Sequence, residues 1–67
     1  MTSQWTAERV RELRTRLGLS QTDFALELRS VFPALRTDAV AVSRWENGHV
    51  TPSGAAAYAL DLLDSRD

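Results

Sequence analysis

The sequence contains no cysteine, which excludes disulfide bonds and metal sites built from thiolates. It has no apolar run near the roughly 18 residues of a membrane span, and its N-terminus lacks the pattern of a signal peptide. Its three glycines are isolated from one another and form no phosphate-binding loop. We therefore expect a cytoplasmic protein that does not contact a membrane.

The sequence offers few groups for catalysis. His49 is the only histidine and lies in a connector beside a glycine, which favours an exposed turn residue over a catalytic or metal-ligating one. A serine triad would need this histidine beside Ser20 or Ser43, and both serines have places in expected helices. Asp61 and Asp64 are three residues apart on a helix face that we expect to be solvated. We predict no enzyme activity, no cofactor, no metal and no small-molecule substrate.

The composition is that of a small globular domain, which we place over residues 1–67. Hydrophobic residues make up 43% of the chain and charged residues 25%. The net charge of −1 does not by itself indicate a nucleic-acid partner, since such proteins usually have a basic balance. All eight basic residues are arginine, whose side chain can donate two hydrogen bonds to a phosphate or to guanine. A biased genomic composition would explain the same excess of arginine.

Capping residues and apolar spacing predict the first two helices. Thr6 is a candidate N-cap for a helix over about residues 7–17, and Gly18 ends that helix. Ser20 is the candidate N-cap of a second helix over about residues 21–31. Pro33 ends this helix, because the residue before a proline avoids helical backbone angles.

Two further helices complete the expected fold. Thr37 or Asp38 can cap a short third helix over about residues 38–46. The last helix, expected over about residues 53–63, is started by Pro52, and the residues after it are expected to fray. The chain is therefore predicted to be all-α, a small bundle of four to five helices.

The third expected helix has an unusual outward side. Val42 and Trp45 are three residues apart and can be buried together. The opposite side carries small apolar and polar groups, namely Ala39, Val40, Ser43 and Arg44. Such a side suits a helix that enters a DNA groove, with the helix before it completing a helix-turn-helix over about residues 21–46.

The residues at this surface have the chemistry of DNA recognition. Arg44 can donate two hydrogen bonds to guanine O6 and N7, and Ser43 can bond a base or a phosphate. The small apolar residues beside them can touch thymine methyl groups. Gln21 and Thr22 begin the second helix, whose free N–H groups suit a phosphate. On residue type alone, however, Arg44 is more simply explained as a surface arginine.

Three motifs carry a family resemblance. They are LGLSQ at residues 17–21, FA at residues 24–25 and VSRWENG at residues 42–48. Together they resemble the Xre/Cro–CI family of helix-turn-helix repressors, and the resemblance covers about residues 7–63. It implies a lambda-repressor-like DNA-binding domain with double-stranded DNA as its partner.

The resemblance also implies roles for single residues. The residues implied to face the bases are Ala39, Val40, Ser43 and Arg44. Gln21 and Asn47 are implied to contact the DNA backbone. A structural ion pair is implied between Arg14 and Glu46, which makes Arg14 a brace rather than a DNA contact.

The segment Ser30–Arg36 departs from the family pattern. Ser20 and Glu46 are farther apart than in typical members, and Arg29 lies near the place of a glycine that usually follows the second helix. The extra residues lengthen either this helix or the turn, so the family does not give the docking angle of the third helix. They also add Arg29 or Arg36 as a phosphate contact. The predicted backbone-contacting set is Gln21, Thr22, Arg36 and Asn47.

We predict a sequence-specific transcription regulator of a prokaryote or phage, in the first instance a repressor. A lone domain of this size makes few DNA contacts, so a homodimer on a palindromic operator is expected. Tyr58 and Leu62 widen the apolar side of the last helix and are the predicted dimer contacts; extra core packing is the other explanation. Two alternatives stay open: an antitoxin that also binds a toxin protein, and a protein-interaction module that has lost DNA binding.

Overall fold

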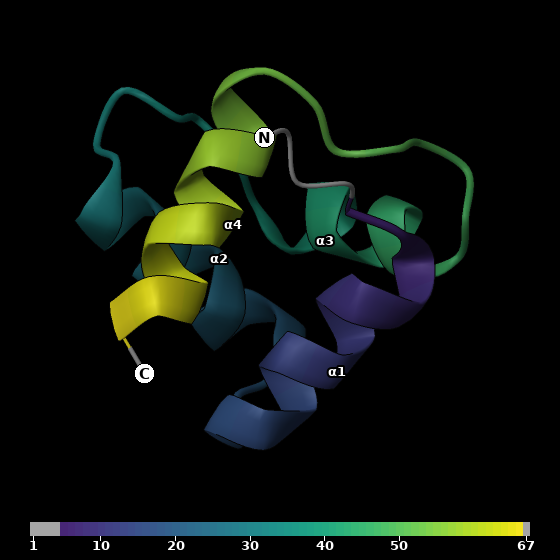
Figure 1. The fold of residues 1–67 in the computed structure, drawn as a ribbon. Coiled ribbons are helices and arrows are strands. Elements are labelled where there is room, and N and C mark those ends of the chain that lie inside the picture. The colour runs from purple at the N-terminus through teal and green to yellow at the C-terminus, as the bar shows by residue number, and fades with distance from the viewer. Residues whose placement is uncertain (1–4, 67) are drawn as a thin grey trace.

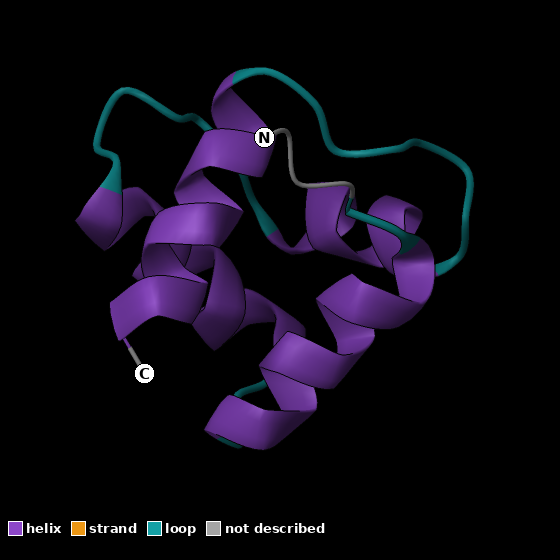
Figure 2. Cartoon of the chain, in the orientation of Figure 1, coloured by secondary structure: helices purple, strands orange, loops and turns teal. Residues whose placement is uncertain are grey.

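The computed structural model describes residues 5–66, and its regular structure is helical (Figure 1, Figure 2). The helices are α1 (Ala7–Leu17), α2 (Gln21–Val31), α3 (Ala39–Glu46) and α4 (Ala55–Arg66). No strand occurs in these described residues, so the predicted all-α fold is confirmed. None of the four helices is long and apolar enough to cross a membrane.

The first three helices begin at the side-chain caps that the sequence indicated. The Thr6 hydroxyl accepts from the backbone N–H of Arg9, and the Ser20 hydroxyl accepts from that of Asp23. At α3 the cap is the second of the two candidates, since the carboxylate of Asp38 accepts from the Ala41 N–H at 3.0 Å. These bonds satisfy N–H groups that have no partner within the first turn of a helix.

The extra residues before α3 are divided between α2, which continues past Arg29, and the turn that follows it. The helix ends at Val31, and the chain reaches the Asp38 cap without further regular structure. The Phe32 carbonyl accepts from the N–H of Leu35 at 2.9 Å, which tightens the start of this turn. The Phe32 ring packs edge-on against Tyr58 of α4, with 5.5 Å between ring centroids. The turn is thereby attached to α4.

The last helix differs from the expectation at both ends. It begins at Ala55 rather than at about residue 53, and Pro52 is a buried connector residue instead of its first helical residue. Gly54 has a φ of 56°, in the left-handed region, so the helix cannot extend backward through it. The helix also continues to Arg66, where a frayed tail was expected.

The core is assembled from all four helices. Its largest fully buried side chains are Phe24, Leu28, Leu60, Leu63, Val10 and Val42. Helix α2 packs against both α3 and α4, and α1 packs against α3. An isolated helix of eight residues is unstable in water, so α3 depends on this packing for its structure.

Three polar contacts tie α4 to the rest of the molecule. The indole N–H of Trp5 donates to Asp61 Oδ1 at 2.8 Å. Asp64 pairs with Arg16 of α1, and the last pair joins Arg66 to Glu27 of α2. The expectation that Asp61 and Asp64 are simply solvated is therefore wrong, because partners distant in the sequence lie beside them.

Candidate nucleic-acid interface

Helix α3 is held on one side and open on the other. Val42, Trp45 and Glu46 are buried against the body of the molecule. Val40 is 59% exposed, and Arg44 is also exposed. A helix anchored in this way can present a fixed set of outward side chains.

A shallow hollow brings together residues from α2, α3 and the connector after α3. Its lining consists of Gln21, Ala39, Val40, Ser43, Arg44, Asn47 and His49. The four predicted base-reading residues are in this set, together with two of the predicted backbone-contacting residues. Thr22 and Arg36 are exposed but do not line the hollow.

His49 is the residue of this hollow that the sequence interpretation did not include. Its backbone N–H donates to the Arg44 carbonyl at 2.9 Å, which folds the connector back against the end of α3. Gly48, with a φ of 77°, makes that reversal possible without steric cost. The sequence signal was the helix end at Asn47–Gly48. The chain reverses direction there, which places His49 beside α3.

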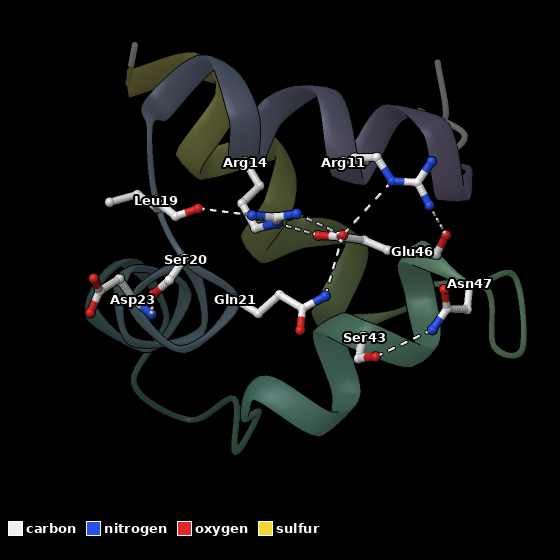
Figure 3. Close-up of polar contacts among 9 residues, drawn as sticks. All are labelled: Arg11, Arg14, Leu19, Ser20, Gln21, Asp23, Ser43, Glu46 and Asn47. Atoms are coloured by element: carbon white, nitrogen blue, oxygen red, sulfur yellow. Dashed lines mark hydrogen bonds and ion pairs between the residues drawn. The ribbon is translucent and has the colours of Figure 1, made fainter.

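Glu46 lies at the centre of the polar contacts in this part of the molecule (Figure 3). Its side chain is 4% exposed. Arg14 of α1 donates through Nε to Oε2 at 2.5 Å and through Nη2 to Oε1 at 3.0 Å. The Gln21 amide adds a long contact of 3.4 Å to Oε1. The ion pair implied by the family resemblance is thus present and is bidentate.

These contacts set the ionisation of the pair. Burial acts to raise the pKa of Glu46, but hydrogen bonds from Arg14 and Gln21 and the charges of Arg14 and Arg11 outweigh it and lower that pKa below its ordinary value. The hydrogen bond to Glu46, aided by its charge, raises the pKa of Arg14 against the effect of burial. Both groups are therefore charged at neutral pH.

Arg11 and Arg14 also bond to backbone carbonyl groups near the helix ends. Arg11 donates through Nη2 to the Glu46 carbonyl at 2.7 Å, and Arg14 donates through Nη1 to the Leu19 carbonyl at 2.9 Å (Figure 3). A cation at the C-terminus of α3 is favourable because the last carbonyl groups there lack helical partners. The sequence interpretation assigned no contact to Arg11. Its position three residues before Arg14, on the same side of α1, was the signal for this contact.

Two of the proposed DNA contacts bond to each other. Asn47 donates through Nδ2 to the Ser43 hydroxyl at 3.3 Å (Figure 3). Ser43 keeps its own hydroxyl proton for another acceptor, and the Asn47 amide keeps a second N–H. Both side chains are thus oriented without using all of their donors.

The predicted dimer residues lie away from the hollow. Tyr58 is 55% exposed despite its contact with Phe32, and Leu62 is half-buried. They belong to α4, which packs against α2. The interface expected for a second copy is therefore separate from the surface expected for DNA.

A comparison with known families shows which family the chain belongs to. Residues 10–61 match a family described as helix-turn-helix, HTH_3. The chain belongs to this family. No curated protein and no solved structure gave a significant match. The resemblance to the Xre/Cro–CI repressors is confirmed, and the chain is a DNA-binding regulatory domain, of a kind that is not typically enzymatic.

Proposed function

We propose that this helix-turn-helix protein is a transcription repressor that binds a palindromic operator as a homodimer, with α3 in the major groove. The observation that carries the proposal is the single hollow that collects Gln21 and the outward residues of α3. The opposite side of α3 is anchored by Val42, Trp45 and Glu46. A helix fixed on one side and open on the other is what major-groove reading requires.

The proposed base contacts follow from the donors and methyl groups of α3. The exposed guanidinium of Arg44 donates two hydrogen bonds to guanine O6 and N7. Ser43 donates to a base acceptor, while Ala39 and Val40 provide apolar contact to thymine methyl groups. Because the surface offers few donors, DNA shape contributes to the choice of sequence as well.

The proposed backbone contacts lie around this helix. Gln21 and Thr22 open α2, where unpaired N–H groups favour a phosphate. Asn47 approaches the backbone from the end of α3, and Arg36 approaches it from the turn before α3. Phosphate contacts fix the register of a protein on the duplex but carry no sequence information. We assign positioning to these four residues and reading to the outward side of α3.

The homodimer follows from the size of the domain. One short recognition helix contacts few base pairs, and two copies related by a two-fold axis double that number. The exposed Tyr58 ring and the adjoining Leu62 form the proposed contact between the copies. The two recognition helices would then meet half-sites about 34–36 Å apart.

Selection of bound DNA from a random pool is the direct test. We expect recovery of a two-fold symmetric sequence that contains a guanine in each half-site. Arg44→Ala should abolish the preference for that guanine, at a cost of about 1–3 kcal/mol for each half-site. Arg29→Ala, which removes an exposed arginine from α2, should leave the preference unchanged.

Two results would contradict the proposal. Recovery of no preferred sequence, with affinity that does not fall as salt rises, would instead fit a protein-interaction module, since real DNA binding is strongly salt-dependent. A preferred sequence that Arg44→Ala does not alter would place the reading surface elsewhere. Repression itself is tested with a reporter gene behind the selected operator, where expression should fall when the protein is present.

A further inference from the structure

A second hollow lies on the other side of Arg44 from Gln21. Its lining consists of Asp38, Val40, Ala41, Arg44, Trp45 and Val50. Five of these residues belong to α3 or its cap, and Val50 comes from the connector. The connector passes around the outside of α3 before it returns to α4 (Figure 1). We call this the valine hollow.

The valine hollow is apolar where a surface is usually polar. Val40 is 59% exposed and Val50 is 47% exposed. Among residues 5–66, the other large hydrophobic side chains that are exposed are Leu26 and Tyr58. Two of these four exposed side chains, Val40 of α3 and Val50 of the connector, therefore lie beside Arg44, which we expect to read DNA.

Val50 is attached to Arg44 through the backbone. The Arg44 carbonyl accepts from the N–H of His49 at 2.9 Å and from the N–H of Val50 at 3.4 Å. These bonds fix the backbone of Val50 against the last turn of α3. A ligand group beside the Arg44 side chain would also lie near the Val50 side chain, because both side chains line the same hollow.

We propose that the valine hollow binds the 5-methyl group of a pyrimidine next to the guanine that Arg44 reads, and that Val50 is a specificity-determining residue. The proposal rests on the proposed function. The thymine methyl is the apolar group that base pairs present in the major groove, so it is the DNA group that two exposed valines can recognise. The proposed base pattern is thus a guanine with a neighbouring thymine.

Charge at the edge of the hollow supports a base rather than a phosphate. The Asp38 carboxylate lines it and is held there by its bond to the Ala41 N–H at 3.0 Å. A phosphate placed beside this carboxylate would be repelled, which offsets the attraction of Arg44 in the same hollow. The ligand that we assign to the valine hollow is therefore a base.

The same chemistry predicts a response to cytosine methylation. 5-Methylcytosine carries its methyl group at the position where thymine carries it. Replacement of the thymine beside the guanine by 5-methylcytosine should therefore cost less affinity than its replacement by cytosine. Burial of one methyl group changes affinity by about fourfold.

The test combines changes in the protein with changes in the DNA. With the operator selected from the random pool, thymine next to the critical guanine is replaced by uracil, which removes only the methyl group. Wild-type protein should lose about fourfold in affinity for each half-site. Val50→Ser should bind more weakly and should no longer distinguish thymine from uracil. Leu26→Ser, which removes a similarly exposed apolar side chain from α2, should retain the wild-type loss.

The outcomes distinguish a failure of this inference from a failure of the proposed function. If wild-type protein binds its operator but uracil costs nothing at any position next to the guanine, the valine hollow does not bind a methyl group. If Val50→Ser keeps the full uracil penalty, Val50 is not the residue that reads it. If no operator is selected at all, the proposed function fails first. Thermal unfolding shows whether Val50→Ser is folded, which its exposed connector position predicts.

Discussion

Arg14 of α1 and Glu46 of α3 form a bidentate ion pair whose carboxylate side chain is 4% exposed. The same carboxylate contacts Gln21 at the start of α2. One buried acid therefore joins α1 to the two helices that carry the proposed DNA surface. Its loss should affect both stability and the placement of α3.

Arg14→Ala should lower the free energy of unfolding by about 3 kcal/mol, because it leaves a buried carboxylate without its main partner. Urea denaturation measures this change. Arg29→Ala removes an exposed arginine and should change stability by less than about 0.5 kcal/mol. Equal effects of the two substitutions would show that Glu46 is solvated well enough to do without Arg14.

The ionisation of Glu46 should make stability depend on acid. Its pKa in the folded protein lies below the ordinary value of 4.5, so the unfolded chain binds a proton there more readily. The contribution of Glu46 is complete above pH 4.5 and is lost as the pH falls from there through the lowered pKa. Urea denaturation at successive pH values should show this loss.

Glu46→Gln supplies the control for the other carboxyl groups, which also titrate in acid. Above pH 4.5 the wild-type protein should be more stable than Glu46→Gln, and the difference should shrink as the pH falls. A difference that stays constant down to pH 3 or below would contradict a lowered pKa.

Local signals were sufficient for α1 and α2. Thr6, Ser20 and Gly18 act on the chain within a few residues of themselves, so the helix ends they define can be derived from sequence. The end of α4 could not be derived in this way. Arg66 stays helical while pairing with Glu27, a residue distant in the sequence. Periodicity and capping carry no information on such contacts.

The same distinction holds for the candidate site. The outward side of α3 follows from helical periodicity alone. The contact of Arg11 with the end of α3, and the place of Val50 beside Arg44, depend on how separate segments pack. Family resemblance supplied the Arg14–Glu46 pair, which spacing alone does not indicate. It did not supply the conformation of the longer turn.

Arg36→Ala tests the proposed phosphate contact from that turn. It should weaken binding to all sequences alike and reduce the slope of log affinity against log salt by about 0.9 for each protomer. Fluorescence anisotropy at several salt concentrations measures both quantities. Arg29→Ala removes the same charge from α2 and should leave the slope unchanged. The reverse pattern would exchange the roles of the two arginines.

Tyr58→Glu tests the proposed dimer contact. A carboxylate on the exposed side of α4 would be desolvated between two copies, so the dimer should dissociate at least tenfold more readily. Sedimentation over a range of protein concentrations measures this. Leu26→Glu places the same charge at a similarly exposed site on α2. If that variant dissociates instead, the copies associate through α2 and not through α4.

Arg11→Ala tests whether the C-terminal end of α3 is positioned by α1. The lost bond to the Glu46 carbonyl is only partly shielded from water, since the Arg11 side chain is 54% exposed, so stability should fall by about 1 kcal/mol. Arg11 lines neither of the two hollows that contain Arg44. The loss of Arg11 should therefore weaken binding to preferred and unrelated operators by the same factor. Competition with the two DNAs measures that ratio. A change in sequence preference would show that the angle of α3 depends on Arg11, and that α1 takes part in choosing the operator.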